Sequence, residues 1–213
     1  MPLLLYCISE SEPAVPAPKV GVREHPVERC SVAGMICYYG ELKQAPARFA
    51  REDALVFHKV ITAIFSRTAV IPFRFPTIVE GLGELEVYLE TEGHDLLESL
   101  QRTRDSVQME VRLHHGEHEA AAGPGAAHLQ DRQRTREILE QLADSARDFL
   151  GDSVQSWHIK EVPNGLRCYA LVRRSEVATF KAKSQALKSE GEVRVAVSGP
   201  WPPTEFLHES PEA

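Results

Sequence analysis

The sequence predicts an α+β protein of two domains, which we place at residues 1–105 and 106–213. Two observations predict this class. Apolar residues recur with a period of two in some segments and near 3.6 in others, which are the periods of strands and helices. The length of 213 residues and the 43% hydrophobic content suit one large or two small domains, each with its own core.

The first strands are predicted near the start of the chain. Leu3–Ser9 is continuously apolar and ends before Ser11-Glu12-Pro13, which is typical of a buried strand. An extended, proline-rich connector follows. Val27–Tyr39 then predicts a pair of strands that ends at Gly40.

Helices are predicted next. Arg51–Phe65 is amphipathic, and its apolar face is formed by Phe57, Val60, Ile61 and Ile64. Ala69–Phe75 is extended, and Pro72 and Pro76 confine it to a sheet edge or an irregular connection. Gly81-Leu82-Gly83 precedes a further helix, which we expect Gly93 to separate from another.

The second half begins with a strand, Val107–Leu113, in which apolar and polar residues alternate. A small-residue loop is expected over 116–127, and a helix over Gln130–Leu150 with a stripe of Leu139, Leu142, Ala143, Ala146 and Phe149. Pro163-Asn164-Gly165 predicts a hairpin whose strands point Trp157, Ile159, Leu166, Cys168, Ala170 and Val172 inward.

The chain ends with a helix capped by Ser175, bearing Val177, Phe180 and Leu187, and a strand from Val193 to Val197. The order of this half is β-α-β-β-α-β. That order is typical of the ferredoxin-like arrangement, in which two helices cover one face of an antiparallel sheet.

The segment Gly199–Phe206, GPWPPTEF, carries three prolines around one tryptophan. Each proline fixes φ and removes an N–H, so we predict an extended tail after the last strand. The tail either packs against its own chain or is read by a proline-binding partner. We favour intramolecular packing because Trp201 and Phe206 are large apolar side chains.

Charge and cysteine content exclude several classes. A net charge of −7 argues against nucleic acid as the main partner. The first residues are too short for a signal peptide and no apolar run is long enough to cross a bilayer, so we expect a cytoplasmic protein with no membrane partner. Cys7, Cys30, Cys37 and Cys168 show no metal-ligand spacing, which suggests free thiols in a reducing compartment, with Cys7 and Cys168 buried.

No catalytic or cofactor motif emerges. His114, His115, Glu117 and His118 form the one metal-like cluster, but Gly116 interrupts it and we favour a solvated loop. We interpret His58 as a histidine at the edge of a core. Nucleophile and phosphate-loop signatures are absent. We therefore predict no enzyme, no cofactor, no metal and no small-molecule substrate.

Three stretches lead to one family when they are taken together: REDALVFHKVI at Arg51–Ile61, AVIPFRFPT at Ala69–Thr77, and GPWPPTEF at Gly199–Phe206. In this order they resemble the GvpL/GvpF family of gas vesicle proteins, over nearly the whole chain. Four positions depart from the family pattern, namely Lys59, Phe73, Pro76 and Thr204. Proline in place of glycine at Pro76 requires a different local turn, because proline cannot take a positive φ.

The resemblance implies two domains, the second a modified ferredoxin-like domain with a Pro-rich C-terminal tail. It also implies a non-enzymatic accessory or minor structural role in gas vesicle formation, with the hydrophobic shell protein and other vesicle proteins as partners. We hypothesise an interaction surface formed or supported by Val70, Ile71, Phe73, Phe75, Trp201 and Phe206; the alternative is that these residues form a core between the domains. Rival functions are a small-molecule-sensing module and an enzyme that uses His58 or the His114–His118 segment.

Overall fold

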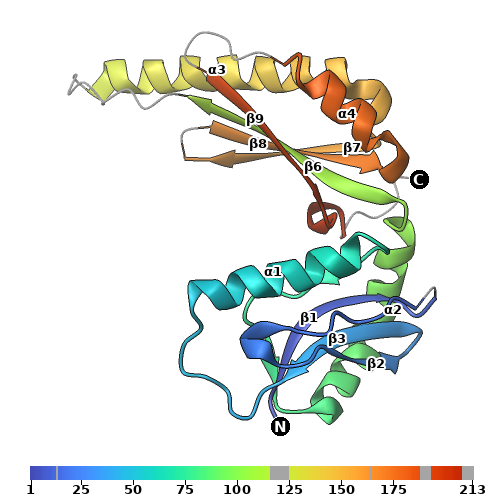
Figure 1. Cartoon of the computed structure of the whole chain (residues 1–213). Coiled ribbons are helices and arrows are strands. Elements are labelled where there is room, and N and C mark those ends of the chain that lie inside the picture. Colours follow the sequence, from blue (N-terminus) through green and yellow to red (C-terminus); the bar gives the residue numbers. More distant parts are fainter. Residues whose placement is uncertain (13, 116–124, 164, 188–192, 208–213) are drawn as a thin grey trace. The chain divides into compact units, whose positions relative to one another are not determined.

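The computed structural model describes residues 1–12, 14–115, 125–163, 165–187 and 193–207. Its described residues have a mixed α/β fold with two antiparallel sheets and four α-helices (Figure 1). Contacts divide the chain into two compact units. Unit 1 is Met1–Arg104 with Phe206–Ala213, and unit 2 is Asp105–Glu205. The domain limits given above stay a prediction, and each unit is described by itself.

Unit 1 contains a sheet with the strand order β2-β3-β1-β4, and β5 also pairs with β1. The strands are β1 (Leu3–Glu10), β2 (Glu28–Val32), β3 (Met35–Glu41), β4 (Ile71–Pro72) and β5 (Ile78–Val79). The predicted first strand is confirmed. The predicted strand pair is the β2–β3 hairpin, whose turn residues Ala33 and Gly34 have φ of 50° and 79°. Two consecutive positive φ values are typical of the tight turns that match strand twist.

Strand β1 is buried on both faces, and a bulge at Tyr6 changes which residues point to each face. Leu5 pairs with Tyr39 of β3, but Cys7 pairs with Tyr38, so Tyr6 is an extra residue. Leu3 and Leu5 before the bulge and Ile8 after it therefore contribute to one core cluster. This explains why the sequence is continuously apolar rather than alternating.

Helix α1 (Arg51–Phe65) has the predicted limits and covers one face of β1. The Phe57 ring lies 5.2 Å from the Tyr6 ring, centroid to centroid. At the helix start, the Asp53 carboxylate accepts the Ala50 N–H at 2.9 Å and pairs with Arg23 at 3.3 Å. A carboxylate in the first turn satisfies a free N–H and favours the positive end of the helix dipole.

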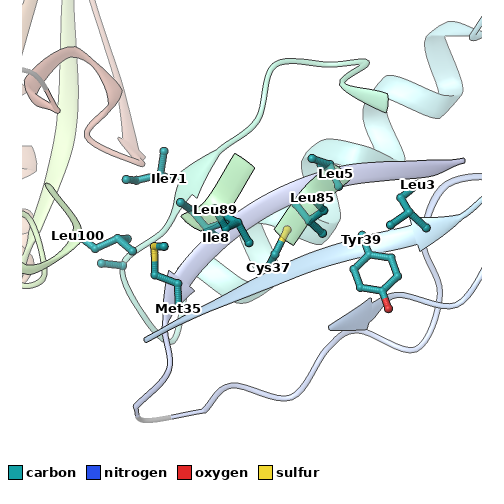
Figure 2. Close-up of a cluster of buried hydrophobic side chains, with 11 residues drawn as sticks. Leu3, Leu5, Ile8, Met35, Cys37, Tyr39, Ile71, Leu85, Leu89 and Leu100 are labelled. Carbon is teal, nitrogen blue, oxygen red and sulfur yellow. The ribbon is translucent and has the colours of Figure 1, made fainter. Parts of the chain in front are cut away.

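Helix α2 (Leu82–Arg102) covers the opposite face, where it contributes three leucines to the cluster in Figure 2. The cluster contains Leu3, Leu5, Ile8, Met35, Cys37, Tyr39, Ala69, Ile71, Leu85, Leu89 and Leu100. The prediction that Gly93 separates two helices is wrong, because α2 runs through it. A Cβ there would lie 3.2 Å from Met35 Cε and 3.4 Å from Ala33 Cβ, so glycine allows the tip of the hairpin to approach the helix.

Unit 2 contains β6 (Ser106–His115), α3 (Gly125–Leu150), β7 (Ser156–Val162), β8 (Gly165–Arg173), α4 (Val177–Ser184) and β9 (Val193–Trp201). Its antiparallel sheet has the order β7-β8-β6-β9. Figure 1 shows α3 and α4 over one face of this sheet. The predicted turn residue Asn164 and most of the predicted loop over 116–127 lie outside the described residues, although 125–127 belong to α3.

The face of the unit 2 sheet that α3 and α4 cover is apolar, and its residues are those that the alternating pattern of the sequence predicts. Directly paired residues of β6 and β8 fill it, namely Val107, Met109, Val111, Leu113, Leu166, Cys168, Ala170 and Val172, all at most 3% exposed. The predicted burial of Cys7 and Cys168 is confirmed. Ile159 pairs with Cys168 on this face, as predicted, but lies on the edge strand β7 and is 43% exposed, whereas Phe149 of the predicted α3 stripe is exposed at 49%. Helix α4 ends at Ser184, so Leu187 is not part of it.

The last strand is longer than predicted. It continues past Val197 through Gly199 and Pro200 to Trp201, at the edge of the sheet. Ser198 pairs with Glu110 and Trp201 with Gln108, so β9 carries one extra residue at this point. A bulge on an edge strand tolerates proline because no ladder hydrogen bond is lost there. Gly199 has a φ of 118°.

We expect Gly199→Ala to destabilise the protein by about 1–3 kcal/mol, the usual cost of a residue held in a disfavoured backbone region. A Cβ would also lie only 2.9 Å from the Gln108 carbonyl oxygen. Urea unfolding monitored by circular dichroism measures the change. The control is Gly83→Ala in α2, where a Cβ meets nothing within 4 Å. Equal unfolding midpoints for the two variants would contradict this account of the bulge.

Candidate protein-interaction surface

The predicted interaction segment Val70–Phe75 follows α1 and contains β4. Val70 is 1% exposed and Ile71 is 9% exposed, and Ile71 belongs to the core cluster of unit 1. Phe73 and Phe75 are half-buried. Val70 and Ile71 therefore support this part of the surface from within, and the two phenylalanines are the members of the segment that reach it.

Phe75 belongs to a group of aromatic rings on the α1 side of the sheet. Its ring centroid lies 4.9 Å from that of Phe57 and 5.0 Å from that of Phe49. The Arg23 guanidinium lies 5.2 Å from the Phe49 ring centroid, a cation–π distance. Phe75 thus connects the segment to the start of α1, and its half-buried ring has a structural role.

Phe73 lies on the α2 side. Its N–H donates to the Tyr6 carbonyl oxygen at 3.0 Å, which holds the segment against β1. Its ring packs against the core cluster and lies 6.1 Å from the ring of Tyr88, which is 39% exposed on α2. We call this pair the Phe73–Tyr88 surface. It combines the exposed ring of Tyr88 with the half-buried ring of Phe73, which packs on the core cluster.

Trp201 and Phe206, predicted as parts of one tail, belong to different units. Trp201 ends β9, where its Nε1–H donates to Ser198 Oγ at 3.4 Å. Phe206 is 1% exposed and belongs to unit 1. The carbonyl oxygen of the next residue, Leu207, accepts from Ser99 Oγ at 2.9 Å and from the Arg102 guanidinium. These contacts favour intramolecular packing of the segment.

Polar side chains occupy the face of the unit 2 sheet opposite the helices. Lys160, Arg167 and Arg112 lie directly abreast on three neighbouring strands. The Glu110 carboxylate accepts two hydrogen bonds from Arg112, at 2.8 and 3.0 Å, and lies 3.6 Å from Arg167 Nε, while Lys160 pairs with Glu205. Each cation of this row therefore contacts a carboxylate.

The Arg112 hydrogen bonds lower the pKa of Glu110 below its ordinary value, with further contributions from the charges of Arg112 and Arg167. Ser198 Oγ also donates to Glu110 at 3.3 Å. Because Trp201 donates to the same Ser198 oxygen, the network joins β6, β8 and the bulged end of β9. The arrangement has the chemistry of a structural ion pair.

The histidines weighed in the sequence analysis are not gathered into one group in the described residues. His58 is exposed on α1, near Thr62. His114 is exposed near the end of β6, and Glu117 and His118 lie outside the described residues. Among the residues that the structure describes, no group of three His, Cys, Asp or Glu side chains is arranged to hold a metal ion. None of the described helices is long and apolar enough to span a bilayer.

Comparison with known proteins identifies the family. The sequence model described as "Gas vesicle synthesis protein GvpL/GvpF" matches residues 2–208. The chain belongs to the GvpL/GvpF family. The resemblance noted in the sequence is therefore confirmed, although the chain matches none of the curated protein sequences.

Two solved GvpF structures share the fold. The crystal structure of the gas vesicle protein GvpF from Anabaena sp. PCC7120 matches with a TM-score of 0.80 and 16% identity, covering 98% of this chain and 97% of the other. That of GvpF from Microcystis aeruginosa matches with a TM-score of 0.80 and 13% identity, covering 98% and 99%. At these identities the likeness shows the fold of a GvpL/GvpF protein and nothing about individual residues.

The sequence did not identify Tyr88 as part of a surface. Tyr88 precedes Leu89 of the buried stripe, and no motif of the GvpL/GvpF resemblance includes it. The one available signal was an aromatic residue at the border of an apolar helix face. That signal is weak, because aromatic side chains at such borders usually complete a core.

We expect Glu110→Gln to lower the free energy of unfolding by about 1 kcal/mol at neutral pH, which is less than is usual for hydrogen bonds to charged groups because Arg112 and Arg167 are partly exposed. The lowered pKa means that the ionised form stabilises the fold above the ordinary pKa, and that this stabilisation is lost as the pH falls through the lowered value. Chemical unfolding at several pH values should therefore show the two proteins converging in acid.

The matched control is Glu140→Gln, which removes an exposed pair with Arg136 on α3 and should change stability little. A Glu110→Gln variant as stable as wild type at neutral pH would show that the network does not stabilise unit 2.

Proposed function

We propose that this protein is a non-enzymatic accessory or minor structural protein of gas vesicle formation. In this role it binds the hydrophobic shell protein and other vesicle proteins, at gas vesicles in the cytoplasm. The observation that carries the proposal is the family match over residues 2–208, which extends across both units. The fold shared with two GvpF crystal structures supports it.

We also propose that the two units are domains and that unit 2 is a modified ferredoxin-like domain. The element order β6-α3-β7-β8-α4-β9 and the sheet order β7-β8-β6-β9 support this assignment. The modification lies at the end of β9, where the bulge at Gly199 and the proline segment extend the last strand.

The proposed binding rests on covering the apolar surface of the shell protein. A small hydrophobic shell protein aggregates in water unless its apolar face is covered before assembly. A soluble partner can cover that face with exposed apolar side chains held by a rigid core. In unit 1 the Phe73–Tyr88 surface meets this description, because Phe73 packs on the core cluster and Tyr88 is 39% exposed.

Co-purification of the shell protein with a tagged form of this chain tests the proposal. We expect wild type to retain the shell protein, and Tyr88→Asp and Phe73→Asp to reduce the retained amount at least about tenfold, because a charge at a desolvated apolar contact costs more than 1.4 kcal/mol. Tyr88→Asp is the primary variant, since its exposed side chain can be changed with little effect on the core.

The control is Leu55→Asp, which places the same charge on an apolar side chain that is 54% exposed on α1. Thermal unfolding of each variant separates loss of binding from loss of fold. If wild type retains no vesicle protein, the assembly role is wrong. If wild type binds but Tyr88→Asp and Leu55→Asp bind equally well, the role stands and the Phe73–Tyr88 surface is not the contact.

A further inference from the structure

Two of the four cysteines face each other across the β2–β3 hairpin. Cys30 of β2 pairs directly with Cys37 of β3, two pairs from the turn at Ala33 and Gly34. Directly opposed residues of antiparallel strands have Cα atoms about 4.5–5.5 Å apart, which lies within the range that a disulfide bridges. At this distance each thiol shifts the pKa of the other through a side-chain hydrogen bond. The hairpin therefore holds both sulfur atoms close together.

The two thiols have unequal surroundings. Cys37 is 0% exposed within the core cluster, whereas Cys30 is half-buried on β2, the edge strand of the sheet. The hydrogen bond from Cys37 lowers the pKa of Cys30, against the opposing effects of burial and of Glu86 on α2. The same hydrogen bond and burial raise the pKa of Cys37. Cys30 is therefore both the more accessible thiol of the pair and the one whose pKa is lowered, which favours it as the nucleophile.

We propose that Cys30 and Cys37 form a peroxide-reactive thiol pair, with Cys30 as the attacking sulfur and Cys37 as the resolving one. The oxidant is a hydroperoxide such as hydrogen peroxide. The product is a cross-strand disulfide between β2 and β3. This site goes beyond the proposed function, because its chemistry needs no vesicle protein.

The reaction balances in two steps. The Cys30 thiolate attacks one oxygen of hydrogen peroxide; the O–O bond breaks, Cys30 becomes a sulfenic acid, and the leaving hydroxide takes up the proton that Cys30 released on ionisation, which gives the first water. The Cys37 sulfur then attacks the Cys30 sulfur, the S–O bond breaks, and the Cys37 proton and the leaving hydroxide form water. Both cysteines are oxidised by one electron each, and the peroxide is reduced to two molecules of water.

Peptide mapping of the full chain tests this proposal. Trypsin leaves both cysteines in one peptide, Cys30–Lys43. After treatment with hydrogen peroxide and blocking of free thiols, we expect this peptide to have lost two hydrogen atoms and to carry no blocking group, and dithiothreitol to reverse the change. Oxidation of Met35 in the same peptide adds oxygen and is distinguished by mass. Before oxidation, Cys30 should be alkylated at least about tenfold faster than the buried Cys7 and Cys168.

Single variants separate the two roles. Cys37→Ser should stop at the sulfenic acid of Cys30, which dimedone traps, and Cys30→Ser should leave Cys37 unmodified. Cys168→Ser, a buried cysteine of unit 2, is the control and should behave as wild type. The wild-type peptide map alone remains decisive if a variant fails to fold. Two free thiols in Cys30–Lys43, at a peroxide concentration that oxidises glutathione, would overturn the proposal.

Discussion

Both faces of strand β1 are buried, and the arrangement of unit 1 follows from the need to cover them. Each large apolar side chain that it buries contributes about 1.5–3 kcal/mol, but only if both faces are covered. Helix α1 supplies Phe57 against Tyr6 on one face, and α2 supplies Leu85, Leu89 and Leu100 on the other. The bulge at Tyr6 makes this possible, because it keeps Leu5 and Ile8 on the same side despite their odd spacing.

The C-terminal end of α2 ties three parts of unit 1 together. Arg104, just after the helix, donates to both carboxylate oxygens of Glu10 at the end of β1, at 2.8 and 2.7 Å. In the last turns of the helix, Ser99 and Arg102 donate to the Leu207 carbonyl oxygen. The last described residues thus return to the helix that covers β1. Residues some hundred positions apart depend on the same helix end for their polar contacts.

Much of this fold was predictable because local pattern and tertiary environment agree. The period of α1 and the alternation of β6 each match the face that is buried. Predictions were wrong where a distant contact decides the outcome. Gly93 predicts a break between two helices, yet it lies inside α2, where the absence of a side chain leaves room for Met35. Gly199 and Pro200 predict the end of a strand, yet β9 continues to Trp201 because Trp201 pairs with Gln108 of β6. The surface role of Tyr88 depends on Phe73, fifteen positions earlier, and no local pattern encodes that contact.

Helix α2 also connects the two sites proposed for unit 1. Cys37 belongs to the core cluster to which α2 contributes Leu85, Leu89 and Leu100, and Tyr88 lies on the same helix. Cys30 packs against the same core cluster as Phe73. A covalent bond between β2 and β3 would therefore act on strands that share a core cluster with α2, the helix that carries Tyr88 of the aromatic pair. Because closely packed cores transmit small displacements, the proposed oxidation at the hairpin and the proposed binding at the Phe73–Tyr88 surface would both act on the core cluster that α2 covers.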